Sequence, residues 1–253
     1  MKLGAQLYSL RTFLQTPEDI RKTFQKIKAI GYENVQLSGA APTDASILRS
    51  ISEECELPIV VTHSPIDRII NDTEALIAEH KIFGCPTIGL GSMPTAYRGS
   101  LAGLDEFLKV MKEPVKKIRD AGLDFAYHNH AFELTPTEGD DRLVLDVMLE
   151  KCTDWGFIMD TYWVEYAGFS ALDYIAKIGK ERLTNIHFKD LANNEQRSIC
   201  SCGSGTLDFG TIYEACVKMD VQNVLVEQDN AVDTEDPFGE MAKSFAHLRP
   251  IVH

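Results

Sequence analysis

Short apolar runs alternate with longer amphipathic stretches along the whole chain. Several of the short runs are continuously apolar rather than alternating, which is typical of strands that are buried on both faces. The runs predict eight strands, at Leu3–Leu7, Asn34–Leu37, Ile59–Thr62, Thr87–Leu90, Leu123–Tyr127, Phe157–Met159, Thr184–Phe188 and Asn223–Val226.

The stretches between these runs carry apolar residues at helical spacing. They predict helices at Pro17–Ile30, Thr43–Glu54, Asp72–Phe83, Gly103–Asp120, Arg142–Lys151, Ala171–Ile178, Phe209–Lys218 and Asp236–Leu248. The helix boundaries carry suitable residues, because Thr16-Pro17 combines an N-cap with a first-turn proline. Glycines at 31, 84 and 122 follow three of the helices, where a left-handed C-cap is favoured.

Strand–helix units that repeat eight times predict a parallel sheet with helical crossovers. The length of 253 residues matches the roughly 250 residues of a (β/α)₈ barrel. No GxGxxG motif follows the first strand, which weakens the alternative of an open dinucleotide-binding sheet. Because no linker or low-complexity segment interrupts the pattern, we expect an α/β fold, a single-domain (β/α)₈ TIM barrel over residues 1–253.

Composition narrows the class of partner. The net charge of −13 argues against a nucleic-acid partner, which requires a basic surface. No run approaches the roughly 18 apolar residues that span a membrane, and the N-terminus lacks an apolar signal stretch. The six cysteines are therefore expected to be reduced thiols in a cytoplasmic protein. The outer helices of a barrel are compatible with a homo-oligomer, and the sequence leaves the oligomeric state open.

Four of the predicted strands in the second half of the chain lead directly into a side chain that can bind a metal. These side chains are His128, Asp160, His187 and Glu227. The ends of parallel barrel strands meet at one rim, so the four groups are expected to converge. Imidazoles and carboxylates suit Zn²⁺, Mn²⁺ or Co²⁺. The pattern predicts one divalent metal ion at the open rim.

Three of the four groups also have structural interpretations. Asp160 can cap the helix that follows it, because Asp is a favoured N-cap residue. His187 can be a hydrogen-bonded histidine of the core. Glu227 can pair with a neighbouring lysine or arginine, since an ionised carboxylate at the end of an apolar strand requires a cation.

The fifth strand offers more than one candidate ligand. His128 and His130 are two residues apart, so an extended strand places them on one face. We expect His128 to bind the metal and His130 to bind substrate or transfer a proton, with the order of the two open. Glu133 is a further candidate for the metal, or it orients an imidazole N–H through a hydrogen bond.

Other residues after the predicted strands can contact a substrate. Lys189 can stabilise an oxyanion, and Arg197 can bind an anionic group. Tyr8 and Trp163 offer aromatic faces to a sugar ring, and His63 can line the pocket. The alternatives are a solvated surface position for Lys189, plain packing for the two aromatic rings and a structural hydrogen bond for His63.

A series of motifs in the same order resembles the sugar phosphate isomerase/epimerase family, the xylose isomerase-like TIM barrels. The resemblance runs over nearly the whole chain. It rests on Gly4-Ala5-Gln6-Leu7-Tyr8-Ser9, Gly31-Tyr32-Glu33-Asn34-Val35-Gln36, Tyr127-His128-Asn129-His130-Ala131-Phe132-Glu133, Met159-Asp160-Thr161, His187-Phe188-Lys189-Asp190, Gly203-Ser204-Gly205-Thr206-Leu207-Asp208-Phe209 and Glu227.

The resemblance implies a metal site. Members of the family commonly bind one divalent ion through Glu, Asp, His and Glu from the fifth to eighth strands, and the last three match Asp160, His187 and Glu227. This chain has His128 where many members have the first glutamate. In that respect it resembles a Tyr-His-Asn-His subgroup that includes sugar isomerases and relatives of inosose dehydratase. The glutamate that matches Glu227 can also move a substrate proton.

These expectations combine into a reaction. We expect a divalent ion (Mn²⁺, Zn²⁺, Co²⁺ or Mg²⁺) to assist proton abstraction next to the carbonyl of a sugar, keto-sugar or cyclitol through an enediolate. Isomerisation or epimerisation is the first expectation, and an inosose-type dehydratase or lyase is the second. A non-catalytic sugar-binding barrel is the third. An apurinic endonuclease is disfavoured, because the chain lacks a basic surface and enough additional ligands for several metals.

Overall fold

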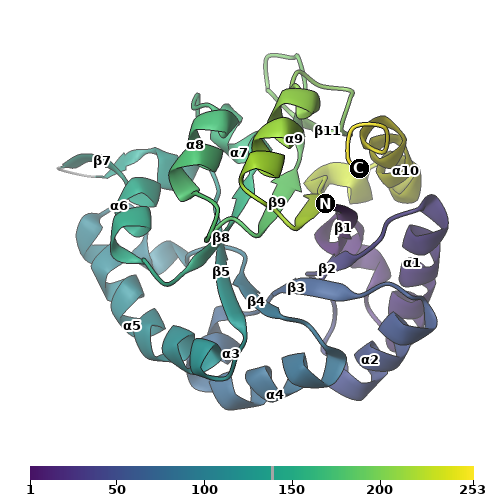
Figure 1. The fold of residues 1–253 in the computed structure, drawn as a ribbon, viewed down its shortest axis with the longest axis horizontal. Helices are drawn as coiled ribbons and strands as arrows, with labels where there is room; N and C mark the ends of the chain where they lie inside the picture. The colour runs from purple at the N-terminus through teal and green to yellow at the C-terminus, as the bar shows by residue number, and fades with distance from the viewer. Residues whose placement is uncertain (138–139) are drawn as a thin grey trace.

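The computed structural model of the chain describes residues 1–137 and 140–253. Eight parallel strands close into a barrel, as Figure 1 shows, and the expected single-domain (β/α)₈ fold is confirmed. The ring runs in the order β1 (Lys2–Gln6), β2 (Val35–Leu37), β3 (Ile59–His63), β4 (Thr87–Leu90), β5 (Asp124–His128), β8 (Gly156–Asp160), β9 (Asn185–Phe188) and β12 (Asn223–Val226).

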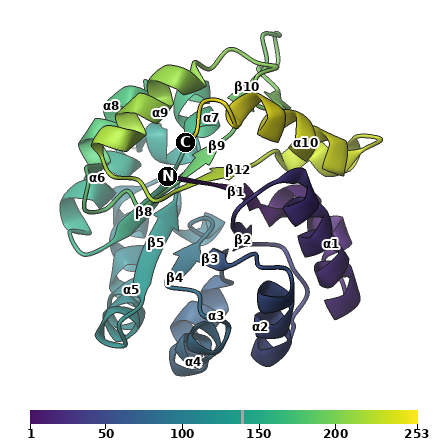
Figure 2. The same cartoon turned by 45° about the vertical axis from the view of Figure 1, so that its right-hand side comes forward.

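Helices form an outer layer around this barrel (Figures 1 and 2). None of them, in the part of the chain that the structure describes, is long and apolar enough to cross a membrane. The α-helices are α1 (Pro17–Ile30), α2 (Ala45–Glu54), α3 (Ile66–Asn71), α4 (Thr73–Phe83), α5 (Leu101–Asp120), α6 (Val144–Lys151), α7 (Thr161–Tyr166), α8 (Ala171–Ile178), α9 (Phe209–Lys218) and α10 (Pro237–Leu248).

Helix caps account for most of the boundaries. The Thr16 hydroxyl accepts a hydrogen bond from Asp19 N, so α1 begins at Pro17 as expected. Asp44 caps α2 in the same way, which moves its start from Thr43 to Ala45. Ser100 caps α5 and moves its start from Gly103 back to Leu101.

The prediction was incomplete in the loops after the strands. The short helices α3 and α7 were missed, because a helix of six residues leaves too little apolar periodicity to detect. The expected helix Arg142–Lys151 was wrong at its first two residues. These belong to β7 (Asp140–Leu143), which pairs with β6 (Pro136–Thr137). A second small ladder joins β10 (Asp190–Leu191) to β11 (Ile199–Cys200).

An apolar plug fills the interior of the barrel. It consists of Val61, Ala126, Ile158 and Leu225, one residue from each of four strands. Side chains two residues apart on a strand point to the same face. The inward positions directly after the plug are therefore His63, His128, Asp160 and Glu227. These polar groups therefore lie in the next layer of the barrel interior, directly after the apolar plug. The larger core lies between the barrel and the helices.

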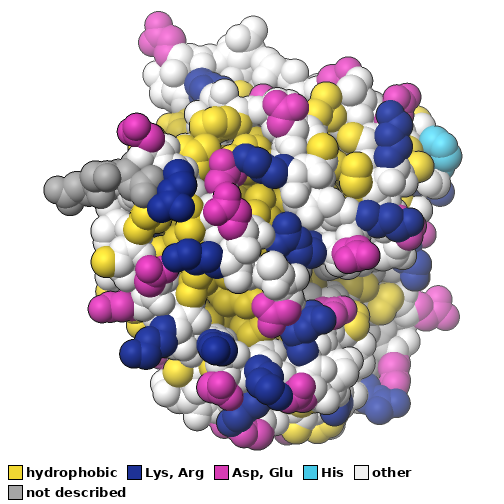
Figure 3. All heavy atoms as spheres, turned by 60° about the vertical axis from the view of Figure 1, so that its left-hand side comes forward, with side chains coloured by type: hydrophobic (Ala, Val, Ile, Leu, Met, Phe, Trp, Pro, Cys, Tyr) yellow, Lys and Arg dark blue, Asp and Glu magenta, His cyan; other side chains and the backbone are white. Residues whose placement is uncertain are grey.

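Charged side chains of both signs are mixed on one face of the molecule. On the face that Figure 3 shows, lysines and arginines are interspersed with aspartates and glutamates. The formal net charge is −13. The view in Figure 3 shows no continuous basic stripe of the kind that tracks a nucleic-acid backbone.

One histidine is buried outside the barrel mouth. His80 on α4 is 2% exposed. Its Nδ1 lies 2.8 Å from Leu76 O, and its Nε2 lies 2.9 Å from Thr62 Oγ1. Burial lowers the pKa of His80 from 6.5 to about 4. The folded chain therefore holds this imidazole neutral at pH values where an exposed histidine takes up a proton.

Acidification is expected to destabilise the fold through His80. Between about pH 6.5 and 4 the unfolded chain binds this proton and the folded chain does not, so the free energy of unfolding falls by about 3 kcal/mol at most. His80→Gln removes the titration, so its stability relative to wild type should improve from about pH 7 to about pH 4.5 in urea titrations. A difference between the two proteins that is independent of pH would contradict this role.

Candidate active site

A cavity of about 570 Å³ opens at the rim where the barrel strands end. Its position is that of the active site in TIM-barrel enzymes. The wall of the cavity is formed by residues at the carboxyl ends of seven of the eight barrel strands or in the loops that follow them. These strands are β1 to β5, β9 and β12. The lining residues are Tyr8, Arg11, Ser38, His63, Ser64, Pro65, Ile66, Leu90, Gly91, Ser92, His128, His130, Lys189, Glu227 and Asp229.

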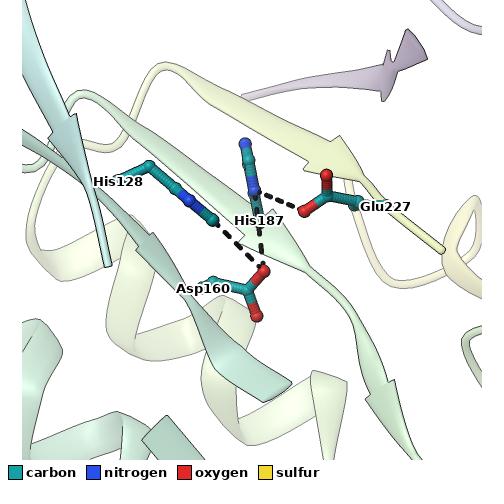
Figure 4. Close-up of side chains that lie close together, drawn as sticks. All are labelled: His128, Asp160, His187 and Glu227. Carbon is teal, nitrogen blue, oxygen red and sulfur yellow. Dashed lines mark hydrogen bonds and ion pairs between the residues drawn. The ribbon is translucent and has the colours of Figure 1, made fainter. Parts of the chain in front are cut away.

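Four buried side chains converge, as Figure 4 shows, and two of them, His128 and Glu227, line this cavity. His128, Asp160, His187 and Glu227 each offer one ligand atom, and these atoms lie within 4.8 Å of one another. His187 Nδ1 is 2.9 Å from Glu227 Oε2 and 3.7 Å from Asp160 Oδ2. His128 Nε2 is 3.4 Å from the same Asp160 oxygen. The sequence-predicted set is therefore brought together at one point.

Hydrogen bonds on the far side of both imidazole rings fix which nitrogen faces this point. His128 Nδ1 lies 2.9 Å from the carbonyl oxygen of Gly91, and His187 Nε2 lies 2.7 Å from Gln36 Oε1. The Gly91 carbonyl can only accept a hydrogen bond, so His128 Nδ1 carries a ring proton. The other nitrogen of each ring, His128 Nε2 or His187 Nδ1, faces a carboxylate oxygen.

A ring nitrogen that faces a carboxylate oxygen needs a proton or a metal ion between the two atoms. Burial alone lowers the pKa of His187, but Glu227 and Asp160 outweigh it and raise the pKa to about 9. A proton can therefore fill the gap, and so can a divalent ion. Two imidazole nitrogens and two carboxylate oxygens suit Zn²⁺, Mn²⁺ or Co²⁺, and the outer hydrogen bonds orient them as ligands. The donor set fits one such ion.

Asp160 combines the two roles that its sequence position suggests. Its Oδ1 accepts a hydrogen bond from Trp163 N at 3.2 Å and so caps α7. Its Oδ2 is directed into the cluster. Burial raises the pKa of this carboxyl, but Lys189 and the two histidines outweigh burial and hold the pKa well below its usual range. One oxygen is structural and the other remains available to a ligand.

Glu227 directly follows β12, and groups from the two strands that pair with β12, which are β1 and β9, hold its carboxylate. Gln6 Nε2 donates to its Oε1 at 2.9 Å, while Oε2 faces His187 and lies 3.4 Å from Lys189 Nζ. Burial acts to raise the pKa of Glu227, but Lys189 and His187 lower it well below its usual value. The carboxylate is therefore ionised at the cavity wall.

Lys189 is buried rather than solvated, at 1% exposure. Its ammonium lies 2.6 Å from Asp229 Oδ2, 3.4 Å from Glu227 Oε2 and 3.5 Å from Asp160 Oδ2. Burial would lower the pKa of this amine, but the three carboxylates raise it above its ordinary value. The side chain carries a fixed positive charge that reaches the cavity.

Two further histidines lie beside the cluster. The rings of His63 and His130 are centred 5.1 Å and 4.8 Å from the ring of His128. Burial lowers the pKa of His63, and it lowers that of His130 to about 3, so both are neutral. His63 Nε2 and His130 Nδ1 are buried without a hydrogen-bond partner. Such atoms at a cavity wall are available to a bound molecule.

The remaining predicted residues divide into two groups. Tyr8 lines the cavity, and Trp163 packs 5.3 Å from the ring of His130. Glu133 points away from the cluster, because its oxygens accept hydrogen bonds from the Tyr127 hydroxyl and from His130 N. Arg197 does not line the cavity, because its guanidinium binds the carbonyls of Glu165 and Tyr166.

Sequence reasoning did not single out four residues of this site. Gln6 and Gln36 are wholly buried amides that hold Glu227 and His187. A lone amide inside an apolar strand was the available signal, since burying it requires hydrogen-bond partners. Arg11 and Asp229 lie in the loops after the first and last barrel strands. Their position was visible in the sequence, but their role depends on the closed barrel.

Solved structures show what this barrel is similar to, although no family model and no curated protein sequence matches the chain. A sugar phosphate isomerase/epimerase from Parabacteroides distasonis superimposes with a TM-score of 0.81 at 20% identity, with 100% of each chain covered. A fusion protein with a xylose isomerase-like TIM barrel matches 98% of this chain at a TM-score of 0.72 and 13% identity, over 42% of its own length. The chain has the xylose isomerase-like TIM-barrel fold.

Proteins of different activities share the xylose isomerase-like fold. A D-allulose 3-epimerase from Methylomonas sp. matches with a TM-score of 0.71 at 13% identity, over 100% of this chain and 98% of its own. A probable 3-DHS dehydratase from Bacillus anthracis matches with a TM-score of 0.72 at 13% identity, over 98% and 99%. Identities this low establish the fold alone, and the chemistry must be argued from the site.

Proposed function

We propose that this chain is a metal-dependent sugar or keto-sugar isomerase or epimerase of the sugar phosphate isomerase/epimerase family. The observation that carries the proposal is the convergence of two imidazole nitrogens and two buried carboxylates at a cavity of about 570 Å³. His128, Asp160, His187 and Glu227 would hold one divalent ion. When bound, that ion supplies a Lewis acid that polarises a carbonyl and its neighbouring oxygen.

The residues around the cluster have the charges that proton abstraction requires. Glu227 is an ionised carboxylate that reaches the cavity, so it can accept a proton from carbon. The protonated Glu227 can then return the same proton at the neighbouring carbon, and the neutral His130, whose Nδ1 has no partner, can hydrogen-bond a substrate hydroxyl. The Lys189 ammonium can stabilise negative charge that develops on a substrate oxygen.

The wall of the cavity suits a polyhydroxylated ring or chain. Ser38, Ser64 and Ser92 place hydroxyl-bearing side chains on it, and His63 adds a free imidazole nitrogen. Tyr8 presents an aromatic face at 38% exposure. Small apolar surfaces beside directed polar groups are typical of sugar sites. A small sugar or cyclitol is therefore the proposed substrate.

A dehydratase or lyase is the second candidate. Two buried imidazole nitrogens at the cavity, His63 Nε2 and His130 Nδ1, have no partner. One imidazole can accept the proton from carbon and, as the imidazolium so formed, donate it to the leaving hydroxyl, so that water departs, while the other hydrogen-bonds that hydroxyl. A probable 3-DHS dehydratase from Bacillus anthracis is among the similar structures. Loss of water from the same substrate class would identify this outcome.

Metal analysis of the purified protein, followed by a solvent-deuterium exchange assay, tests the proposal. We expect about one divalent ion per chain, and deuterium incorporation at carbon in one member of a panel of ketoses, 3-keto-sugars and inososes. A chelator should stop the exchange, since the ion polarises the carbonyl. Sugar binding that is indifferent to chelator, without any exchange, would instead indicate a non-catalytic binding barrel.

A further inference from the structure

One positive charge at the cavity is not matched by a carboxylate. Arg11 lines the cavity from the 3₁₀ helix that follows β1. Its Nη1 donates to the carbonyl oxygens of Asp229 at 2.8 Å and Tyr8 at 3.1 Å, and its guanidinium lies 4.5 Å from the centre of the Tyr8 ring. Among the described residues, no carboxylate forms an ion pair with it. The carbonyl bonds fix its position and leave its charge uncompensated.

The backbone next to Arg11 is shaped to this arrangement. Gly39 has a φ of +71°, and a Cβ at this position would lie 3.0 Å from both Arg11 Cβ and Tyr8 Cδ2. Only a residue without a side chain fits this conformation and this close approach without strain. The loop after β2 therefore packs directly against the arginine and the tyrosine, and this contact supports their place in the wall.

The charges of the proposed metal site balance without Arg11. Asp160, Glu227 and Asp229 surround the ammonium of Lys189 and leave two negative charges in excess. A divalent ion bound by the cluster neutralises these two charges. Arg11 then remains as a net positive charge on the same wall, held against the backbone of Asp229. A guanidinium is always protonated, so this charge persists at every working pH.

We propose that Arg11 is a binding site for an oxyanion of the substrate, a carboxylate or a phosphate. The N–H groups of a guanidinium match the paired oxygens of such a group, and a charge-assisted hydrogen bond is about twice as strong as a neutral one. This inference rests on the proposed function and narrows its substrate class to anionic sugars, either sugar acids or sugar phosphates.

Anion titration of the purified protein tests the site without any turnover. Isothermal titration with inorganic phosphate and with acetate is expected to show binding that weakens about tenfold to a hundredfold in Arg11→Gln. Arg197→Gln is the matched control, because that guanidinium also binds two backbone carbonyls and lies 5.6 Å from a tyrosine ring centre, but outside the cavity. Binding that is unchanged in Arg11→Gln, or equally weakened in Arg197→Gln, would overturn the proposal.

Two additional measurements separate the possible failures. Arg11→Lys keeps the positive charge but loses the planar pair of guanidinium N–H donors, so its affinity for the anion should lie between those of wild type and Arg11→Gln. This variant also provides a test if Arg11→Gln does not fold. Among substrates, the kcat/KM ratio of a sugar acid or sugar phosphate to its neutral parent should exceed one and fall in Arg11→Lys. A wild-type preference for the neutral parent sinks the inference and leaves the proposed function intact. Anion binding that depends on Arg11, without turnover of any sugar, would contradict the proposed function and leave the anion site intact.

Discussion

Glu227→Gln is expected to lower turnover about a thousandfold or more, because it removes both a ligand of the proposed ion and the base that accepts the substrate proton. The glutamine can still accept the hydrogen bond from Gln6, so the pairing of β1 with β12 should be kept. Turnover and bound metal should both be measured, together with thermal unfolding. Loss of activity in a folded protein with reduced metal content is the expected result.

A second carboxylate provides the control for this substitution. Glu240 on α10 accepts hydrogen bonds from Lys243 and, at 3.3 Å, from Gln228, and it does not line the cavity. Glu240→Gln should therefore keep wild-type turnover and metal content. Full activity in Glu227→Gln would exclude Glu227 from the mechanism, whatever the control shows.

Lys189→Met is expected to destabilise the metal-stripped protein by about 3–5 kcal/mol, because it leaves buried carboxylates without their cation. The ammonium contacts Asp160, Glu227 and Asp229, and it is almost entirely buried. Adding back the divalent ion should recover much of this loss, since ligand binding stabilises the folded state. Urea unfolding with chelator and with added ion measures both effects.

A lysine on the surface provides the control for Lys189→Met. Lys177 forms an ion pair with Asp146 at 2.6 Å, but its side chain is 49% exposed. Lys177→Met should lower the free energy of unfolding by less than about 1 kcal/mol, with or without metal. A loss in Lys189→Met that is the same in chelator and in added ion would show that the lysine and the ion do not share these carboxylates.

The barrel could be predicted because each strand is a short apolar run. Runs such as Thr87–Leu90 and Asn223–Val226 coincide with the observed strands to the residue. Continuous apolar runs of this kind depend on burial on both faces, which the closed barrel imposes on its strands. The ladder of β6 and β7 could not be found in this way, because β6 has only two residues and β7 has the polar sequence Asp-Asp-Arg before its single leucine.

The metal-capable cluster could be predicted because it needs only the strand ends and the parallel direction of the sheet. Its surroundings depend on contacts across the barrel, which no local pattern encodes. Arg197 was predicted to bind an anionic group, but its guanidinium binds backbone carbonyls outside the cavity. Arg11 reaches the cavity only because the loop after β12 lies beside the loop after β1.

The seam between the first and last strands has a consequence for how activity arises. The Gln6–Glu227 and Arg11–Asp229 hydrogen bonds each span more than two hundred residues of chain. During synthesis, the ribosome must release the chain as far as Glu227 or Asp229 before the corresponding bond can form. A nascent or truncated chain that lacks the final strand therefore holds most of the ligands without their last carboxylate. Under the proposed function, the active site is therefore complete only when the first and last strands of the barrel pair.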